Sequence, residues 1–169
     1  MAHPRRSSDA FAQTAEGARF LIVEARYYDE IGAMMLQGAR AALATADARH
    51  ELVNVPGALE IAVAMKIALD AAEAAGAPFA GALALGCVIR GETYHFEIVA
   101  NESARALTTL GLERGLALGN GILTVENEAQ AIERADPTRG DKGGDAARAA
   151  LALHGLKRRL EASRHGAVR

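Results

Sequence analysis

Four short apolar runs alternate with stretches of helical periodicity along this chain, and this alternation limits the possible folds more than any other feature. The runs cover residues 20–25, 52–55, 80–88 and 116–125. Between them, apolar residues recur three and four positions apart, which is the spacing of one buried helix face, in residues 31–42, 61–69 and 96–107. Two further helices are expected after the last run, at about 128–134 and 145–160.

Apolar strands joined by helices predict a parallel sheet that is buried on both faces and has right-handed connections. The expected fold class is therefore α/β, as a three-layer αβα sandwich around a four-stranded parallel sheet. In such sheets ligands bind beyond the carboxyl ends of the strands. The residues that directly follow each apolar run are therefore the candidates for a functional site.

One local signal disagrees with this pattern. Residues 118–122 contain an Asn-Gly step between apolar residues, which by itself is typical of a tight β-hairpin. A hairpin here would leave two strands of only a few residues and would interrupt the alternation of strands and helices. We therefore predict one strand, with the glycines marking a place where another segment packs closely on the backbone.

Composition excludes several classes of function. The chain has 169 residues, the length of about one domain, and its net charge is −2, so bulk electrostatic binding to nucleic acid or to acidic membranes is not expected. No stretch approaches the roughly 18 consecutive apolar residues that span a bilayer. The single cysteine excludes an internal disulfide framework and a cysteine-rich zinc module, and it favours a reducing, cytoplasmic location.

The domain organisation is predicted to be simple. Residues 1–18 are expected to form a flexible arm, residues 19–160 the folded domain and residues 161–169 a tail. The arm contains basic residues but also Asp9 and Glu16, and no apolar core follows, so a secretory signal is not supported.

Two of the candidate sites follow the first and second strands. Tyr27 comes after the first run and offers a flat face for stacking on a heterocycle, although a tyrosine packed on its own helix turn fits equally well. After the second run, Pro56 and Gly57 start a helix whose first turn contains Glu60. The Glu60 carboxylate either accepts hydrogen bonds from ligand hydroxyls or simply complements the helix dipole.

The third run leads into the most informative stretch, residues 86–96. Gly91 permits a tight turn, and the N–H groups after it and the Thr93 hydroxyl are placed to face an anion at a helix start. Imidazole groups titrate near neutrality, so His95 is a candidate proton shuttle, the alternative being a histidine bonded to a carbonyl. Cys87 has no activating base nearby in the sequence and is interpreted as a small core residue.

The segment after the fourth run contains basic candidates. Asn127 and Gln130 have the spacing of a capping box that opens a short helix ending near Arg134. Residues 136–144 are predicted to form a functional loop, in which Lys142 and Arg134 complete an anion site or remain solvated charges. The basic residues 157–159 are predicted to favour the end of the last helix.

Three motifs, in this order, resemble the 6,7-dimethyl-8-ribityllumazine synthase family of riboflavin biosynthesis. They are Val-Pro-Gly-Ala-Leu-Glu at 55–60, Gly-Cys-Val-Ile-Arg-Gly-Glu-Thr-Tyr-His-Phe at 86–96 and Gly-Ile-Leu-Thr-Val-Glu-Asn at 121–127. The resemblance implies a flavodoxin-like fold and an enzyme without cofactor or metal. It also implies a homopentamer, or multiples of one, with active sites between subunits, and no nucleic-acid or membrane partner.

The implied reaction condenses 5-amino-6-(D-ribitylamino)uracil with 3,4-dihydroxy-2-butanone 4-phosphate to give 6,7-dimethyl-8-ribityllumazine, phosphate and water. By the same resemblance, Tyr27 stacks on the pyrimidine, His95 transfers protons, and Asn120 and Arg134 come from a neighbouring subunit, with Arg134 on the phosphate. The other implied substrate-binding residues are Gly57, Ala58, Leu59 and Glu60 at the ribityl chain, Cys87, Val88 and Ile89 at the ring edge, Glu92 and Thr93 at the phosphate, and Lys142 nearby.

Three other interpretations belong to different classes. A phosphoacceptor receiver domain needs an aspartate at the end of its third strand, where this chain has Gly86 and Cys87. An FMN-binding electron carrier needs a hydroxyl-rich loop after the first strand, where Arg26 and Tyr27 stand instead. A non-catalytic member of the same family, which binds flavin or lumazine or builds a shell, stays open as the alternative.

Overall fold

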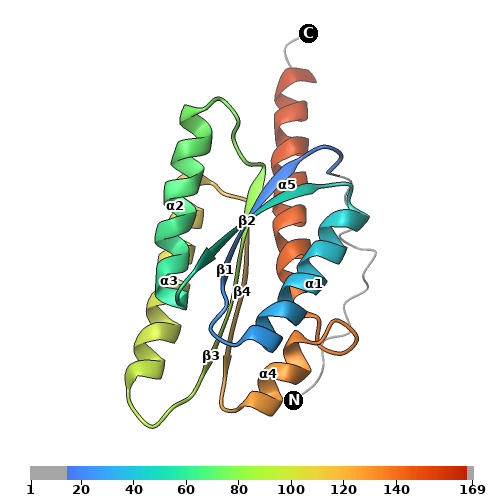
Figure 1. The fold of residues 1–169 in the computed structure, drawn as a ribbon. Helices are drawn as coiled ribbons and strands as arrows, with labels where there is room; N and C mark the ends of the chain where they lie inside the picture. Colours follow the sequence, from blue (N-terminus) through green and yellow to red (C-terminus); the bar gives the residue numbers. More distant parts are fainter. Residues whose placement is uncertain (1–14, 167–169) are drawn as a thin grey trace.

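The sheet of this protein is parallel and has four strands. The structure, a computed structural model, describes residues 15–166 (Figure 1). The strands are hydrogen-bonded in the order β2-β1-β3-β4, which confirms the predicted α/β fold. The elements are β1 (Arg19–Ala25), α1 (Asp29–Thr45), β2 (Arg49–Val55), α2 (Ala58–Ala74), β3 (Gly81–Ile89), α3 (His95–Arg114), β4 (Leu118–Val125), α4 (Glu128–Ala135) and α5 (Lys142–Gly166).

Helices cover both faces of the sheet and create two separate cores. On one face α1, α4 and α5 pack against Phe20 and Ile22, and on the other face α2 and α3 pack against Leu21 and Val23 (Figure 1). These four residues alternate along β1, because successive strand side chains point to opposite faces. The three-layer arrangement is therefore the one that the sequence predicts.

The two outer strands differ from the uniformly apolar strands that were expected. β2 begins at Arg49, three residues earlier than its apolar run, and its residues alternate between exposed and partly buried. β4 also alternates, whereas β1 and β3 are buried along almost their whole length. An outer strand has a neighbour on one side only, so polar residues such as Arg49 and Glu51 are tolerated there.

The Asn-Gly step lies inside a single strand, as predicted. A Cβ atom on Gly119 would come within 1.9 Å of the Ala146 carbonyl oxygen, and one on Gly121 within 3.0 Å of the Ala146 Cβ. Helix α5 therefore packs directly against the backbone of β4 at these glycines. The Asn120 side chain accepts a hydrogen bond from the Ile122 N–H at 3.0 Å instead of forming a hairpin turn.

Helix α4 begins with the predicted cap. The Asn127 side chain accepts a hydrogen bond from the Gln130 N–H at 3.0 Å. The Gln130 side chain, however, accepts from the Glu126 N–H at 3.1 Å and not from Asn127, so the reciprocal half of the capping box is shifted by one residue.

Helix α5 is longer at both ends than predicted. It starts at Lys142, so the expected loop over residues 136–144 is shorter, and it continues to Gly166. Asp141, with a φ of 42°, caps this helix because its Oδ1 accepts from the Gly144 N–H at 3.2 Å. The two glycines that suggested a loop instead permit close packing, since a Cβ on Gly143 would lie 1.9 Å from the Met35 carbonyl oxygen.

The basic residues 157–159 lie well before the end of α5 and have a different role from the one expected. Lys157 donates from Nζ to the carbonyl of Gly115 at 2.9 Å. Gly115 is the left-handed C-cap of α3, so Lys157 stabilises the end of a neighbouring helix and not of its own.

The ends of the chain are only partly described. Ala15 is buried, and its N–H donates to the Ala46 carbonyl at 2.8 Å, so residue 15 belongs to the packed structure. The remainder of the expected arm, residues 1–14, and the last residues of the expected tail, 167–169, lie outside the described residues. Within residues 15–166, none of the helices is both long and apolar enough to cross a membrane.

Candidate active site

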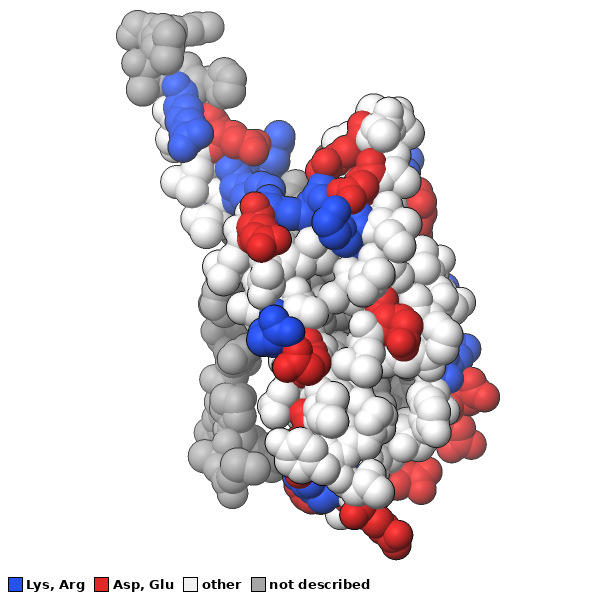
Figure 2. Space-filling view, turned by 90° about the vertical axis from the view of Figure 1, so that its left-hand side faces the viewer, with Lys and Arg blue, Asp and Glu red and all other residues white. Residues whose placement is uncertain are grey.

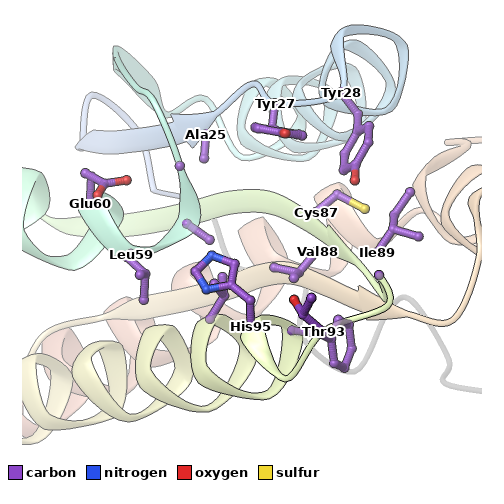
Figure 3. A pocket seen from close by; sticks show the side chains of 15 residues that line it. Ala25, Tyr27, Tyr28, Leu59, Glu60, Cys87, Val88, Ile89, Thr93 and His95 are labelled. Carbon is purple, nitrogen blue, oxygen red and sulfur yellow. The ribbon is translucent and has the colours of Figure 1, made fainter.

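A pocket of about 380 Å³ lies at the carboxyl end of the sheet (Figure 3). The ends of β1 and β3 and the starts of α2 and α3 form it, as expected for a parallel sheet. Ten of the residues proposed from the sequence line it: Tyr27, Gly57, Ala58, Leu59, Glu60, Cys87, Val88, Ile89, Thr93 and His95. Five other lining residues were not among the proposed site residues: Ala25, Tyr28, Gly91, Phe96 and Val99.

Two tyrosines form one rim of the pocket. The Tyr27 and Tyr28 rings contact each other edge to face, with centroids 5.0 Å apart. Tyr27 is 74% exposed, so its ring face is open to a ligand, whereas Tyr28 is half-buried. Burial raises the pKa of Tyr28, with a smaller contribution from Cys87, and this phenol is therefore neutral at physiological pH.

The start of α2 brings Glu60 to the pocket. Gly57 is the N-cap of this helix, in an extended conformation, and the Glu60 carboxylate folds back over it. A Cβ at Gly57 would come within 2.9 Å of Glu60 Oε2, so glycine gives the carboxylate its place. Within residues 15–166, the Glu60 side chain has no hydrogen-bond or ion-pair partner.

The start of α3 brings Thr93 and His95 to the same pocket. In Figure 3 the His95 ring lies between Leu59 and Val88, and Thr93 lies beside Val88. Both Thr93 and His95 are exposed residues that line the pocket, not members of a closed core. Neither side chain has a polar partner in the part of the chain that the structure describes, so hydroxyl and imidazole are free to contact a ligand.

Cys87 lines the pocket, but its thiol is unreactive at neutral pH. Burial raises the pKa of its thiol to about 11, so the thiolate that would act as a nucleophile is scarce at neutral pH. Its side chain belongs to the core beneath α1. The interpretation of Cys87 as a small core residue is confirmed.

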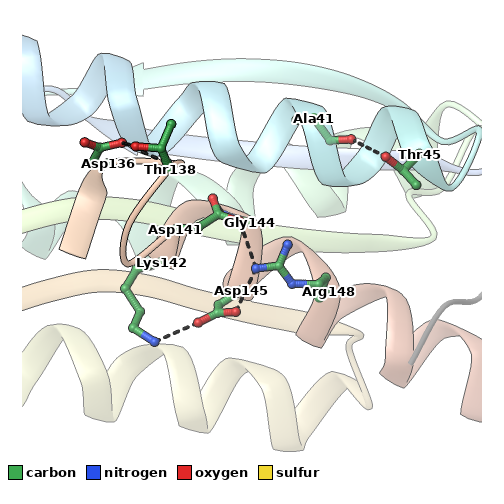
Figure 4. Close-up of polar contacts among 9 residues, drawn as sticks. All are labelled: Ala41, Thr45, Asp136, Thr138, Asp141, Lys142, Gly144, Asp145 and Arg148. Atoms are coloured by element: carbon green, nitrogen blue, oxygen red, sulfur yellow. Dashed lines mark hydrogen bonds and ion pairs between the residues drawn. The ribbon is translucent and has the colours of Figure 1, made fainter. Parts of the chain in front are cut away.

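Four proposed residues do not line this pocket. Glu92 is exposed in the loop before α3, and Asn120 is exposed on β4. Arg134 donates to the Gln130 carbonyl of its own helix at 3.0 Å. Lys142 pairs with Asp145 at 2.7 Å (Figure 4). Within one chain, the structure therefore does not bring Arg134 and Lys142 to the other candidates.

The sequence analysis missed a partly buried ion pair at the end of β1. Glu24, within the first apolar run, is completely buried, and its Oε1 lies 2.6 Å from Arg26 Nε. Its Oε2 has no hydrogen-bond partner among the described residues. The sequence does contain one indication of this pair, a single carboxylate within an apolar run, two positions before an arginine. Residues two apart in a strand point to the same face, so the two side chains could have been expected to meet.

The site combines a stacking surface, an unpaired carboxylate, a hydroxyl at a helix start and an exposed imidazole. These groups are chemically suited to contact a polar heterocycle and an anion and to transfer protons. A parallel αβα sandwich with this pocket at the carboxyl ends places the chain in the class of flavodoxin-like α/β proteins, whose ligand sites lie at this edge of the sheet.

Comparison with known proteins gives the family. The family model of 6,7-dimethyl-8-ribityllumazine synthase matches residues 17–158. The chain is 72% identical over 162 residues to the 6,7-dimethyl-8-ribityllumazine synthase of Methylocella silvestris, covering 96% of this chain and 99% of the relative. It is 62% identical to that of Beijerinckia indica, covering 91% and 85%, and 58% identical to one of Rhodopseudomonas palustris, covering 95% and 98%. The chain belongs to the 6,7-dimethyl-8-ribityllumazine synthase family.

Proposed function

We propose that this chain condenses 5-amino-6-(D-ribitylamino)uracil with 3,4-dihydroxy-2-butanone 4-phosphate in the pocket at the carboxyl end of its sheet. The enzyme is a transferase of riboflavin biosynthesis. One observation supports this position of the active site. Four residues, Tyr27, Glu60, Thr93 and His95, line the same pocket, and their polar side-chain groups have no partner within residues 15–166. The phosphorylated and ribityl substrates are strongly polar metabolites, so we place the reaction in the cytoplasm.

The pyrimidine is proposed to bind between the first two strand ends. Tyr27 stacks on the ring, because its face is open at the rim of the pocket. Glu60 accepts hydrogen bonds from ribityl hydroxyls, with the backbone of Gly57, Ala58 and Leu59 beside it. The backbone of residues 87–89 holds the polar edge of the ring.

The phosphate is proposed to bind at the start of α3. The proposed donors are the Thr93 hydroxyl and the N–H groups of residues 92 and 93, which directly precede a 20-residue helix whose dipole favours an anion at its start. Glu92 acts here through its backbone only, because its side chain is an acid. Arg134 from a neighbouring copy completes the phosphate site, and Lys142 lies in the adjoining region.

The reaction needs little beyond alignment and proton transfer. The aromatic amine adds to the ketone with loss of water, phosphate departs, and the second nitrogen closes the ring with loss of another water. Aligning two bound reactants contributes up to roughly 7–11 kcal/mol, whereas a general acid or base contributes about 3–5 kcal/mol. We therefore assign His95 the movement of protons between these groups and assign most of the rate to positioning.

The exposed surface beside the pocket supports a site shared between copies. Leu59, Val63 and Ile67 repeat along α2 and are 38%, 62% and 65% exposed. Figure 2 faces the side of the molecule that carries α2 and α3, and broad parts of this side are uncharged. Because Leu59 also lines the pocket, a second copy that covers this stripe would close the site. We propose a homopentamer, or multiples of it.

The function is tested with purified protein and both substrates. Lumazine formation is followed by absorbance and compared with the same mixture without protein and with each substrate alone. Turnover above the uncatalysed background supports the proposal. Tight binding of lumazine without turnover would instead identify a non-catalytic member of the family.

A further inference from the structure

We propose that Arg90 is a positioning residue that holds the first turn of α3, and with it Thr93 and His95, in the pocket. The proposal rests on the proposed function, because it assigns Arg90 to the same site. Arg90 does not line the pocket and contacts no proposed substrate group, so it acts through its neighbours.

Arg90 connects three elements that meet beside the pocket. Its Nε pairs with Glu126, directly after β4, at 2.7 Å, and its NH1 pairs with Glu97 in the first turn of α3. Its guanidinium carbon lies 4.1 Å from the centre of the Phe96 ring, and its backbone N–H donates to the Val125 carbonyl at 2.9 Å. The two residues that follow His95 are thus both held by Arg90.

The helix that carries His95 needs such a contact because its start is otherwise uncapped. The N-cap of α3 is Tyr94, whose side chain makes no capping hydrogen bond. Helix α4, by contrast, starts with the Asn127 cap. Without a cap, the first turn of a helix opens readily, and here that turn contains the proposed proton shuttle.

The Arg90 ion pairs are partly exposed, so their main effect is on the position of the first turn of α3 and not on the stability of the fold. The side chains of Arg90, Glu97 and Glu126 are 38%, 31% and 59% exposed, and ion pairs of this kind contribute little to global stability. A displacement of about 1 Å at a reacting group, however, costs up to about a hundredfold in rate. Loss of Arg90 should therefore reduce catalysis far more than stability.

The other end of α3 provides a matched control. Arg114 pairs with Asp70 and with Glu73, the latter at 2.6 Å, so it also joins two carboxylates to α3. It is far from the pocket along this helix, and it is no more exposed than Arg90. Arg114→Met thus removes a comparable contact without touching the site.

The first experiment does not depend on activity. Hydrogen exchange of the ligand-free protein, followed by mass spectrometry, is compared for the parent, Arg90→Met and Arg114→Met. We expect exchange of the first hydrogen-bonded amides of α3, in residues 98–101, to become about tenfold faster in Arg90→Met only. Unchanged exchange in this segment would overturn the proposal, whether or not the protein makes lumazine.

The second experiment separates positioning from direct binding. Arg90→Met should lower kcat about 10- to 100-fold and leave the affinity for lumazine within about twofold, with melting temperatures of Arg90→Met and Arg114→Met within a few degrees of the parent. Arg90→Lys, which keeps the charge, should recover part of kcat. A variant in which only the KM for the ketone phosphate rises would make Arg90 a direct phosphate ligand instead of a positioning residue, and unchanged values of both kcat and KM would exclude any role in the site. If the parent itself is inactive, the proposed function fails, and the exchange experiment alone decides on Arg90.

Discussion

The two ends of the sheet differ in how their polar groups are used. A hollow of about 890 Å³ lies at the amino end, larger than the pocket of about 380 Å³ at the carboxyl end. Several polar groups around the larger hollow already have protein partners: Arg19 pairs with Glu51, Arg49 donates to the Gly17 carbonyl and Lys157 to the Gly115 carbonyl. At the carboxyl end, Glu60, Thr93 and His95 have none among the described residues.

Under the proposed function, unpaired polar groups identify the site better than the size of a cavity does. A group with a protein partner contributes to the fold, whereas a group without one is available for a ligand. Changes at the carboxyl end should therefore reduce activity, and changes at the amino end should reduce stability. Five predictions test this contrast.

The largest effect is expected for Arg134→Ala. If Arg134 holds the phosphate, its loss should lower kcat/KM for the ketone phosphate by about 10³-fold, the effect of removing a strong anion ligand. Steady-state kinetics with varied ketone phosphate measure this. An unchanged kcat/KM would remove Arg134 from the site and leave only its contact with Gln130.

The same variant tests whether the site is shared. Arg134→Ala and His95→Ala chains are mixed, unfolded and refolded together. If each site takes His95 from one copy and Arg134 from the next, about a quarter of the sites regain both residues in a random mixture. His95→Ala mixed with Thr93→Ala serves as the control, since both residues come from the same chain and no site regains both.

The next effect is expected for His95→Ala. Loss of a general acid–base should slow turnover by about 10²-fold without abolishing it, because alignment supplies most of the rate. Single-turnover rates measured against the uncatalysed background check the prediction. Activity no higher than the background would mean that proton transfer by His95 contributes more to the rate than the alignment of the substrates does.

Much of the fold could be predicted because a strand that is buried on both faces consists of a run of apolar residues. The central strands β1 and β3 are apolar along almost their whole length, and the runs at 20–25 and 80–88 locate them. The start of β2 at Arg49 lies outside any such run, because an outer strand tolerates polar residues. The start of α5 at Lys142 could not be predicted, because the glycines in its first turn suggested a loop. These glycines permit close packing against α1, and the spacing of apolar residues gives no information on such packing.

The site could be predicted where its residues follow the strands directly. Tyr27, Glu60 and His95 were found in this way, since the ends of parallel strands meet at one edge. The contacts of Arg90 were missed, because Glu97 and Glu126 lie in different segments and only folding brings them together.

A smaller effect concerns Cys87, which belongs to the buried part of the carboxyl end. Its folded pKa of about 11 lies above the ordinary value of 9.0, so the unfolded chain loses the proton first as the pH rises. This contribution to stability is complete below about pH 9 and is lost as the pH rises through about 11, by roughly 2–3 kcal/mol. Urea unfolding between pH 8 and 10.5 should show a smaller loss for Cys87→Ala than for the parent. Parallel curves would mean that the thiol is as accessible as in the unfolded chain.

The smallest effects give the most direct comparison of the two ends. Lys157→Met removes the hydrogen bond to the C-cap of α3 and should lower the free energy of unfolding by about 0.5–1 kcal/mol, with kcat within twofold of the parent. Thr93→Val removes a hydroxyl that has no partner in residues 15–166, so it should leave stability unchanged and raise the KM for the ketone phosphate. Urea unfolding and steady-state kinetics on both variants form a two-by-two test. If Thr93→Val destabilised the fold as Lys157→Met does, the Thr93 hydroxyl would belong to the structural contacts, and unpaired groups would no longer mark the site.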